Sequence, residues 1–145
     1  MRSNRGIMRR DFEILEEDQD FLESLDLPWE TVKDGNSLWV IVHRHPLPDG
    51  YNQDVVSLAV NVPIGYPRTQ LDMAYFFPAL SRMDGQPIGA LAQLTINGKI
   101  WQRWSRHRTG KNPWREGIDC LATHFALIDH WLHREFKLRP YAVPA

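Results

Sequence analysis

Residues 63–78 read PIGYPRTQLDMAYFFP and decide the fold, because they mark where one extended segment ends and another begins. Pro63 and Pro67 exclude their segment from a central strand, since proline cannot donate a hydrogen bond to a neighbouring strand. The run from Leu71 to Phe77 behind them predicts a strand that stops at Pro78. This stretch therefore ends one strand and introduces the last strand of a series.

Three further strands are predicted upstream. Trp29 to Lys33 and Ser37 to His45 flank the turn Asp34-Gly35-Asn36, in which Asp-Gly supplies the positive φ that a tight hairpin needs. Val55 to Val62 is the third predicted strand. Together with Leu71 to Phe77, these segments predict a four-stranded antiparallel meander.

Helices are predicted on both sides of the meander. From Asp11, apolar residues recur at helical spacing between acidic ones, which predicts an amphipathic helix of about four turns closed by Pro28. Asp119 is a plausible N-cap for a second helix that ends near Lys137. Its predicted core stripe is Leu121, Phe125, Ile128 and Leu132. The predicted class is α+β.

The composition fits one globular domain, expected over residues 11–139, between a flexible arm (1–10) and a tail (140–145). The chain has 145 residues, 43% hydrophobic and 24% charged, and a net charge of −1, which excludes a disordered chain and argues against a nucleic-acid-binding composition. Its single cysteine, Cys120, excludes an internal disulfide and a cysteine-based zinc site. No apolar run approaches the ~18 residues of a membrane span, and no secretory signal is recognised, so a cytoplasmic protein is expected.

Charge is distributed unevenly along the chain. Residues 11–30 hold nine acidic residues and no Lys or Arg, whereas residues 99–115 hold six basic residues and no acid. Each run is either a solvated face or a surface for an oppositely charged partner. The acidic residues expected to steer a basic partner are Glu16, Glu17, Asp20 and Glu23.

The region after Pro78 has a different pattern. Residues 80–91 are predicted to form an irregular connection, and residues 95–100 a tight turn between short extended pieces. Trp101 to Trp114 is then predicted to be a basic, tryptophan-rich loop. Loops of this length are uncommon in compact domains and are often functional.

Two groups of motifs resemble a known family. Pro63-Ile64-Gly65-Tyr66-Pro67, with Phe76, Phe77 and Pro78, resembles the Pro-x-x-Tyr-Pro segment and following strand of ubiquitin-conjugating (E2) enzymes. More specifically, the chain is similar to prokaryotic E2 family E in Trp101-Gln102-Arg103-Trp104-Ser105-Arg106-His107-Arg108, Trp114, Gly117, Asp119, Leu121, Thr123 and His124. The resemblance implies a UBC-like fold and a bacterial ubiquitin-like conjugation or processing pathway. It also implies an E1-like adenylating partner and a ubiquitin-like protein, with antiphage defence as a natural setting.

The chain departs from the family pattern where the chemistry of ordinary E2 enzymes occurs. Those enzymes carry a cysteine after an Asp-Gly-x-Ile pattern, whereas here Asn97-Gly98-Lys99-Ile100 is followed by Trp101. The family's His-Pro-Asn triplet is also missing, and the first helix is acidic where ordinary E2 enzymes present basic residues to the E1. Cys120, at the start of the last predicted helix, is expected to be a structural, small hydrophobic side chain.

Two hypotheses follow for the basic loop. Ser105 and His107 could serve as an acyl carrier and its base, because residues two apart on an extended segment share a face. Alternatively, the loop holds the tail of a ubiquitin-like protein without covalent chemistry, in a non-catalytic scaffold. The residues expected to contact the partner are Trp101, Arg103, Trp104, Arg106 and Arg108.

Two other classes of site receive less support from the sequence. His43 and His45 are expected to share a strand face as half of a metal site, but no further ligand is indicated, so no metal and no cofactor are expected. Nucleic-acid binding is an alternative role for the basic, tryptophan-rich loop. The near-neutral total charge and the acidic first helix argue against it.

Overall fold

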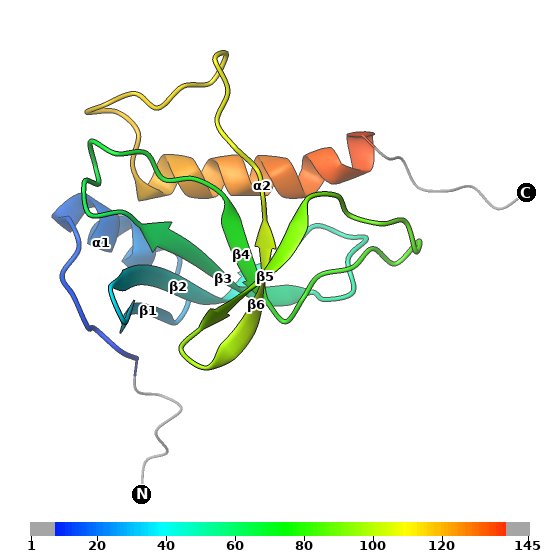
Figure 1. The fold of residues 1–145 in the computed structure, drawn as a ribbon, viewed down its shortest axis with the longest axis horizontal. Helices are drawn as coiled ribbons and strands as arrows, with labels where there is room; N and C mark the ends of the chain where they lie inside the picture. Colours follow the sequence, from blue (N-terminus) through cyan, green and yellow to red (C-terminus); the bar gives the residue numbers. More distant parts are fainter. Residues whose placement is uncertain (1–7, 139–145) are drawn as a thin grey trace, which may run out of the picture.

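The computed structural model describes residues 8–138 and shows one antiparallel sheet with two helices (Figure 1). Helix α1 (Glu16–Ser24) comes first and helix α2 (Leu121–Leu138) last. The strands between them are β1 (Trp29–Asp34), β2 (Ser37–Pro46), β3 (Val55–Val62), β4 (Ala74–Phe77), β5 (Leu91–Ile96) and β6 (Lys99–Trp104). The α+β class is confirmed.

The sheet has six strands in the order β1-β2-β3-β4-β6-β5, all pairs antiparallel, so the predicted number of four strands is wrong. The added pair comes from residues 91–104. Asn97 and Gly98 adopt positive φ angles of 49° and 84° and close a tight β5–β6 turn, as the Asn-Gly pair favours. The predicted tight turn was therefore the end of a full hairpin, and the loop expected from Trp101 starts only after Trp104.

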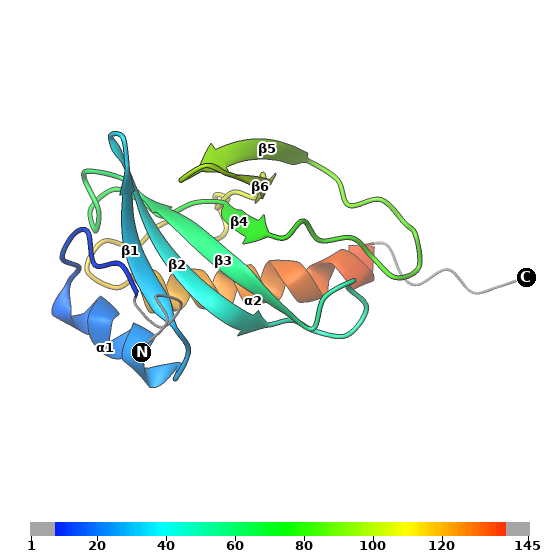
Figure 2. The same cartoon turned by 90° about the horizontal axis from the view of Figure 1, so that it is seen from below.

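The sheet curls so that its first and last hairpins meet. The backbone N–H of Asn97, in the β5–β6 turn, donates a 2.9 Å hydrogen bond to Asp34 Oδ2 at the end of β1. Figure 2 shows the β5–β6 end of the sheet curving back toward the β1–β2 end. The face turned away from α2 therefore forms its own apolar cluster of Val32, Trp39, Ile41, Ala59, Tyr75, Ile96 and Trp101.

Helix α2 covers the opposite face of the sheet (Figure 2). The predicted stripe Leu121, Phe125, Ile128 and Leu132 is buried against that face, which confirms it as core. The helix begins at Leu121, so Asp119 lies one residue before the capping position. The side chain of Asp119 instead accepts hydrogen bonds from the backbone N–H and guanidinium of Arg115.

The first helix is shorter than the sequence predicts. Its nine residues begin at Glu16, because the segment before it pairs with the edge strand: Asp11 N–H donates to the Thr31 carbonyl, and Thr31 N–H to the Arg9 carbonyl. Backbone pairing with β1 thus replaces the predicted first helical turns. Residues 1–7 of the expected arm and the tail 140–145 lie outside the described residues, whereas Arg9 and Arg10 contact β1.

Candidate functional site

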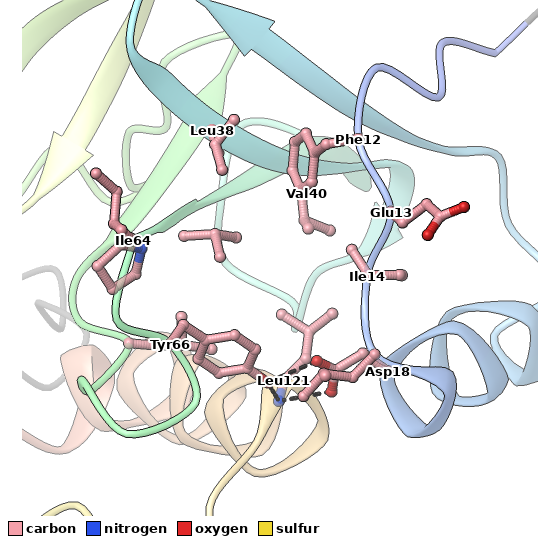
Figure 3. Close-up of a pocket in the computed structure, with 13 residues that line it drawn as sticks. Phe12, Glu13, Ile14, Asp18, Leu38, Val40, Ile64, Tyr66 and Leu121 are labelled. Atoms are coloured by element: carbon pink, nitrogen blue, oxygen red, sulfur yellow. Dashed lines mark hydrogen bonds between the residues drawn. The ribbon is translucent and has the colours of Figure 1, made fainter.

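A pocket of about 430 Å³ opens between the segment before α1, the end of β3 and the start of α2 (Figure 3). Its wall is mostly apolar and includes Phe12, Ile14, Val40 and Leu71. Ile64 stands at the rim with 94% of its surface exposed. The Pro-x-x-Tyr-Pro segment, which decides the fold in sequence, therefore also forms one side of a pocket.

A polar network lies at the base of the pocket. Tyr66 Oη donates a 2.6 Å hydrogen bond to Asp18 Oδ2, and Leu121 N–H contacts both Tyr66 Oη (3.0 Å) and Asp18 Oδ1 (3.3 Å) (Figure 3). Asp18 is 2% exposed. A carboxylate from α1 therefore caps the first N–H of α2, where the helix dipole favours negative charge. Burial, followed by the hydrogen bond to Asp18, raises the pKa of Tyr66 above its usual value, so the phenol remains a donor.

The connection from 105 to 120 is anchored beside this pocket. Trp114 Nε1 donates a 2.9 Å hydrogen bond to the Pro67 carbonyl, and the Arg108 guanidinium lies 4.7 Å from the centre of the Trp114 ring. Asp119 is buried, which alone would raise its pKa, but the hydrogen bonds from Arg115 outweigh burial and lower the pKa to about 2. The carboxylate is thus charged at neutral pH and keeps the end of the loop against α2.

His124 is the buried histidine behind the loop. Its Nε2 donates to the Met73 carbonyl at 2.9 Å, and its Nδ1 faces Arg108 Nη2 at 3.5 Å. Burial, together with the nearby Arg108 charge, lowers the pKa of His124 to about 4 although the Met73 carbonyl acts in the other direction. The imidazole is therefore neutral at pH 7 and serves as a structural donor.

Ser105 and His107 are placed near each other in sequence but no hydrogen bond joins their side chains among residues 8–138. His107 Nδ1 is 2.7 Å from Asp72 Oδ2, and its side chain is 60% exposed. Ser105 is held by its backbone, whose N–H donates to the Ala90 carbonyl at 3.0 Å. The structure thus brings a carboxylate to His107, which the sequence analysis did not identify.

Most of the side chains predicted to bind a partner in this region are buried or half-buried. Trp101 and Trp104 are 4% and 0% exposed, because they lie on β6 and pack on the two faces of the sheet. Arg103 and Arg106 are half-buried, and the Arg108 side chain is 4% exposed. A partner that docks on this conformation does not reach the two tryptophan rings. The reachable basic side chains of the connection are His107, Lys111 and Arg115.

The acidic residues predicted to steer a partner lie at the surface. Glu16, Glu17, Asp20 and Glu23 are all exposed on α1, whereas Asp18 turns inward.

Cys120 is half-buried, and its backbone N–H donates to Thr123 Oγ1 at 3.0 Å at the start of α2. That local cap explains why the chain turns into the helix at this residue.

His43 and His45 do not share a face, so the expected half of a metal site is wrong. A β-bulge interrupts the β2–β3 register between Val42 and His45, and Arg44 within it has a φ of 61°. The extra residue reverses the alternation of side chains. His45 therefore points under α2, where its Nε2 lies 2.9 Å from Asp129 Oδ1.

His43 stays on the other face, which it shares with Ile41, and contacts residues of two neighbouring strands. His43 Nδ1 lies 2.8 Å from Ser57 Oγ, and His43 Nε2 lies 2.7 Å from Glu30 Oε2. Sequence reasoning missed this trio because its members are 13 and 14 residues from the histidine. The available signal was strand pairing: Ser57 and Glu30 fall on the two strands expected beside His43.

Comparison with known proteins identifies the family of the chain. Residues 14–135 match the family described as prokaryotic E2 family E, a span that contains most of the pocket lining, the connection 105–120 and most of α2. No curated protein and no solved structure matches the chain. Within residues 8–138, neither helix is both long enough and apolar enough to cross a membrane.

Proposed function

Since the chain belongs to prokaryotic E2 family E, we propose that it is an E2-like component of a bacterial ubiquitin-like conjugation or processing pathway, acting in the cytoplasm. It holds the tail of a ubiquitin-like protein beside the connection 105–120, next to an E1-like adenylating partner, and antiphage defence is the setting we propose. The observation that carries this proposal is the family match over the segments that build the pocket and the connection.

The proposed carrier function does not use the cysteine position of ordinary E2 enzymes. Trp101 follows the Asn-Gly-Lys-Ile stretch, and its ring lies 5.6 Å from that of Phe77 with 4% of the residue exposed. Cys120, the single cysteine, is half-buried at the start of α2. We therefore propose that the tail is held by non-covalent contacts, for which Lys111 and Arg115 are exposed cations of the connection 105–120.

The test of tail binding is a charge reversal on the connection. The ubiquitin-like partner should bind the wild type, and Lys111→Glu should weaken binding, measured by titration calorimetry; Arg115 is left in place because its guanidinium holds Asp119. Lys137→Glu is the matched control, because it reverses an exposed charge in the last turn of α2. Equal affinities for all three proteins would contradict this surface assignment.

The acidic face of α1 is the proposed docking surface for the E1-like protein. Charge steering weakens with ionic strength because the Debye length falls from about 10 Å at 0.1 M salt to about 3 Å at 1 M. Replacing Glu16, Glu17, Asp20 and Glu23 with Lys should slow association and remove its salt dependence in stopped-flow measurements. An unchanged association rate would leave this face with a role in solubility only.

A second candidate, an acyl carrier at Ser105, is supported by the His107–Asp72 contact. A carboxylate at Nδ1 favours the neutral tautomer with its proton on Nδ1, in which Nε2 is the nitrogen that can accept a proton from a hydroxyl. Ser105 Oγ would attack the carbonyl carbon of an E1-bound thioester: the C–O bond forms, the C–S bond breaks, and His107 passes the hydroxyl proton to the leaving thiolate. Side chains without a mutual hydrogen bond in the free protein can still form one in the complex.

The oxyester has a distinct chemical signature. With the E1-like protein, ATP and the ubiquitin-like protein, the adduct should survive reducing agent and be cleaved by hydroxylamine. Ser105→Ala should abolish it, and His107→Ala should slow its formation roughly 10²–10⁴-fold. An adduct that thiols remove, or that persists in Ser105→Ala, excludes this mechanism, whereas no adduct in any condition favours the non-covalent function.

A further inference from the structure

The trio Ser57, His43 and Glu30 is a chemically complete relay that the proposed function does not use. The carboxylate of Glu30 lies at one imidazole nitrogen and the hydroxyl of Ser57 at the other, at 2.7 and 2.8 Å. With the Nε2 proton directed at the carboxylate, Nδ1 is the acceptor for the Ser57 hydroxyl proton. This is the order of groups that activates a serine nucleophile.

Three observations show that the trio is held in place. Glu30 Oε1 accepts a 3.1 Å hydrogen bond from the Arg9 backbone N–H, which fixes the carboxylate while Oε2 holds the imidazole. His43 N–H donates to the Pro28 carbonyl at 2.8 Å, and the regular register through Val42 and Leu58 places His43 across from Ser57, directly before the bulge at Arg44. Bulges and non-glycine residues at positive φ are concentrated at functional sites.

The trio is also reachable from solvent. It lies on the sheet face turned away from α2, because Trp29 and Leu58, the neighbours of Glu30 and Ser57 in their strands, belong to the cluster that packs on α2. The His43 side chain is 29% exposed, that of Glu30 is 15% exposed, and Ser57 is half-buried. A reagent that approaches the trio from this face does not have to displace α2.

The surroundings of Ser57 indicate the class of substrate. Phe77 is its direct cross-strand partner on β4, and the rings of Phe77 and Trp101 lie 5.6 Å apart, so an acyl group on Ser57 would rest on an aromatic surface. Lys99 Nζ lies 5.2 Å from the centre of the Phe77 ring. Lys99 therefore brings a cation to this aromatic surface, and a cation close to a carbonyl oxygen under attack favours the negative charge that develops there.

We propose that Ser57, His43 and Glu30 form a second nucleophilic site, which hydrolyses esters or thioesters with aromatic or apolar acyl groups. Ser57 Oγ bonds to the acyl carbon, the bond to the leaving group breaks, and the hydroxyl proton passes through His43 to that group. Water then attacks the acyl-serine: His43 takes a proton from the water and returns one to Ser57 Oγ, releasing the carboxylic acid. Glu30 orients the imidazole throughout as a positioning residue.

A fluorophosphonate probe tests the nucleophile directly. In the folded protein Ser57 Oγ should displace fluoride from phosphorus, and peptide mass spectrometry should locate the adduct on Ser57. Urea should abolish this labelling because it separates the three strands. His43→Gln should lower the labelling rate roughly 100-fold or more, the usual size of general-base help. Ser37→Ala and His133→Ala, both exposed residues away from the trio, are the matched controls and should label as the wild type does.

Two further measurements address substrate class and positioning. Hydrolysis of 4-nitrophenyl phenylacetate should exceed that of 4-nitrophenyl acetate, and Phe77→Ala should remove the preference. Glu30→Gln should lower the maximal rate more than it changes the Michaelis constant, because the residue acts through the imidazole. A folded protein that is not labelled at Ser57, or labelling that His43→Gln leaves unchanged, overturns the proposal. Neither result bears on binding of the ubiquitin-like protein, which uses other residues and another assay.

Discussion

The two faces of the sheet treat the same side-chain types in opposite ways. On the side covered by α2, two histidines are buried: His45 on β2 contacts Asp129, and His124 on α2 contacts the Met73 carbonyl. On the open face, His43 is partly exposed between a hydroxyl and a carboxylate. The difference teaches that burial and strand geometry, more than residue identity, decide whether an imidazole serves only as a structural hydrogen-bond partner or can act as a general base.

The largest expected effect separates the two histidines of β2. His45 is 6% exposed and packs edge-on to Phe125 with ring centres 5.9 Å apart, so His45→Ala leaves a cavity beside α2 and should destabilise the protein by roughly 3–4 kcal/mol. His43→Ala removes a partly exposed ring and should cost about 1 kcal/mol. Urea unfolding of both variants measures the two costs.

The same two variants should show the opposite order of effects on labelling of Ser57 by the fluorophosphonate probe. Folded His45→Ala should keep labelling at Ser57, measured well below its unfolding midpoint, whereas His43→Ala should lose it. Equal stability costs for the two substitutions would show that the bulge does not divide the faces as the register indicates.

A pH effect of similar size is expected at His124. Its pKa is about 4 in the folded protein against 6.5 in the unfolded chain, so the unfolded chain binds more protons between these values. Stability is complete above pH 6.5 and should fall by roughly 3 kcal/mol as the pH drops to 4. His124→Gln removes this titration and should flatten that part of the curve, measured by urea unfolding at several pH values. A slope identical to that of the wild type would mean that the pKa of His124 is the same in the folded protein as in the unfolded chain.

Much of the fold could be predicted from the sequence because local patterns decide it. The strand Val55–Val62 is observed at its predicted bounds, and the stripe of α2 is buried as predicted. The β5–β6 hairpin was only half predicted, because Trp101 and Trp104 looked like loop aromatics although each packs on a sheet face. The first turns of α1 failed for a tertiary reason: β1 needs a backbone partner at Thr31, and residues 9–11 supply it.

The candidate sites were harder to predict because they depend on contacts between residues that are far apart in the sequence. Ser105 and His107 were chosen for being two residues apart, yet His107 pairs with Asp72, 35 residues away. Ser57 and Glu30 had no local motif, and the bulge that moves His45 to the other face contains a positive φ at Arg44, a residue type that does not predict one. Register shifts of one residue exchange faces, and hydrophobic patterning alone does not reveal them.

The base of the pocket provides an intermediate effect. Tyr66→Phe removes the 2.6 Å hydrogen bond to the buried Asp18 carboxylate and should destabilise the protein by about 2 kcal/mol. Tyr75→Phe is the matched control: its hydroxyl makes no hydrogen bond to another described residue, so its cost should be within about 0.5 kcal/mol. Thermal unfolding of the two variants distinguishes them. Equal costs would mean that the Asp18 network contributes nothing to the docking of α1 on α2.

The smallest expected effect concerns the bulge that divides the faces. Arg44 is exposed and has a φ of 61°, a conformation that costs a non-glycine residue roughly 1 kcal/mol and costs glycine almost nothing sterically. Arg44→Gly should therefore stabilise the protein by up to about 1 kcal/mol, reduced by the greater freedom of glycine in the unfolded chain. Arg44→Val, whose branched side chain fits this conformation poorly, should instead destabilise it. Chemical unfolding measures both signs, and Ser57 labelling should be unchanged in Arg44→Gly because that variant keeps the extra residue. If Arg44→Gly were destabilising and Arg44→Val neutral, the left-handed conformation at this position would be wrong, and with it the reason that His43 and His45 lie on opposite faces.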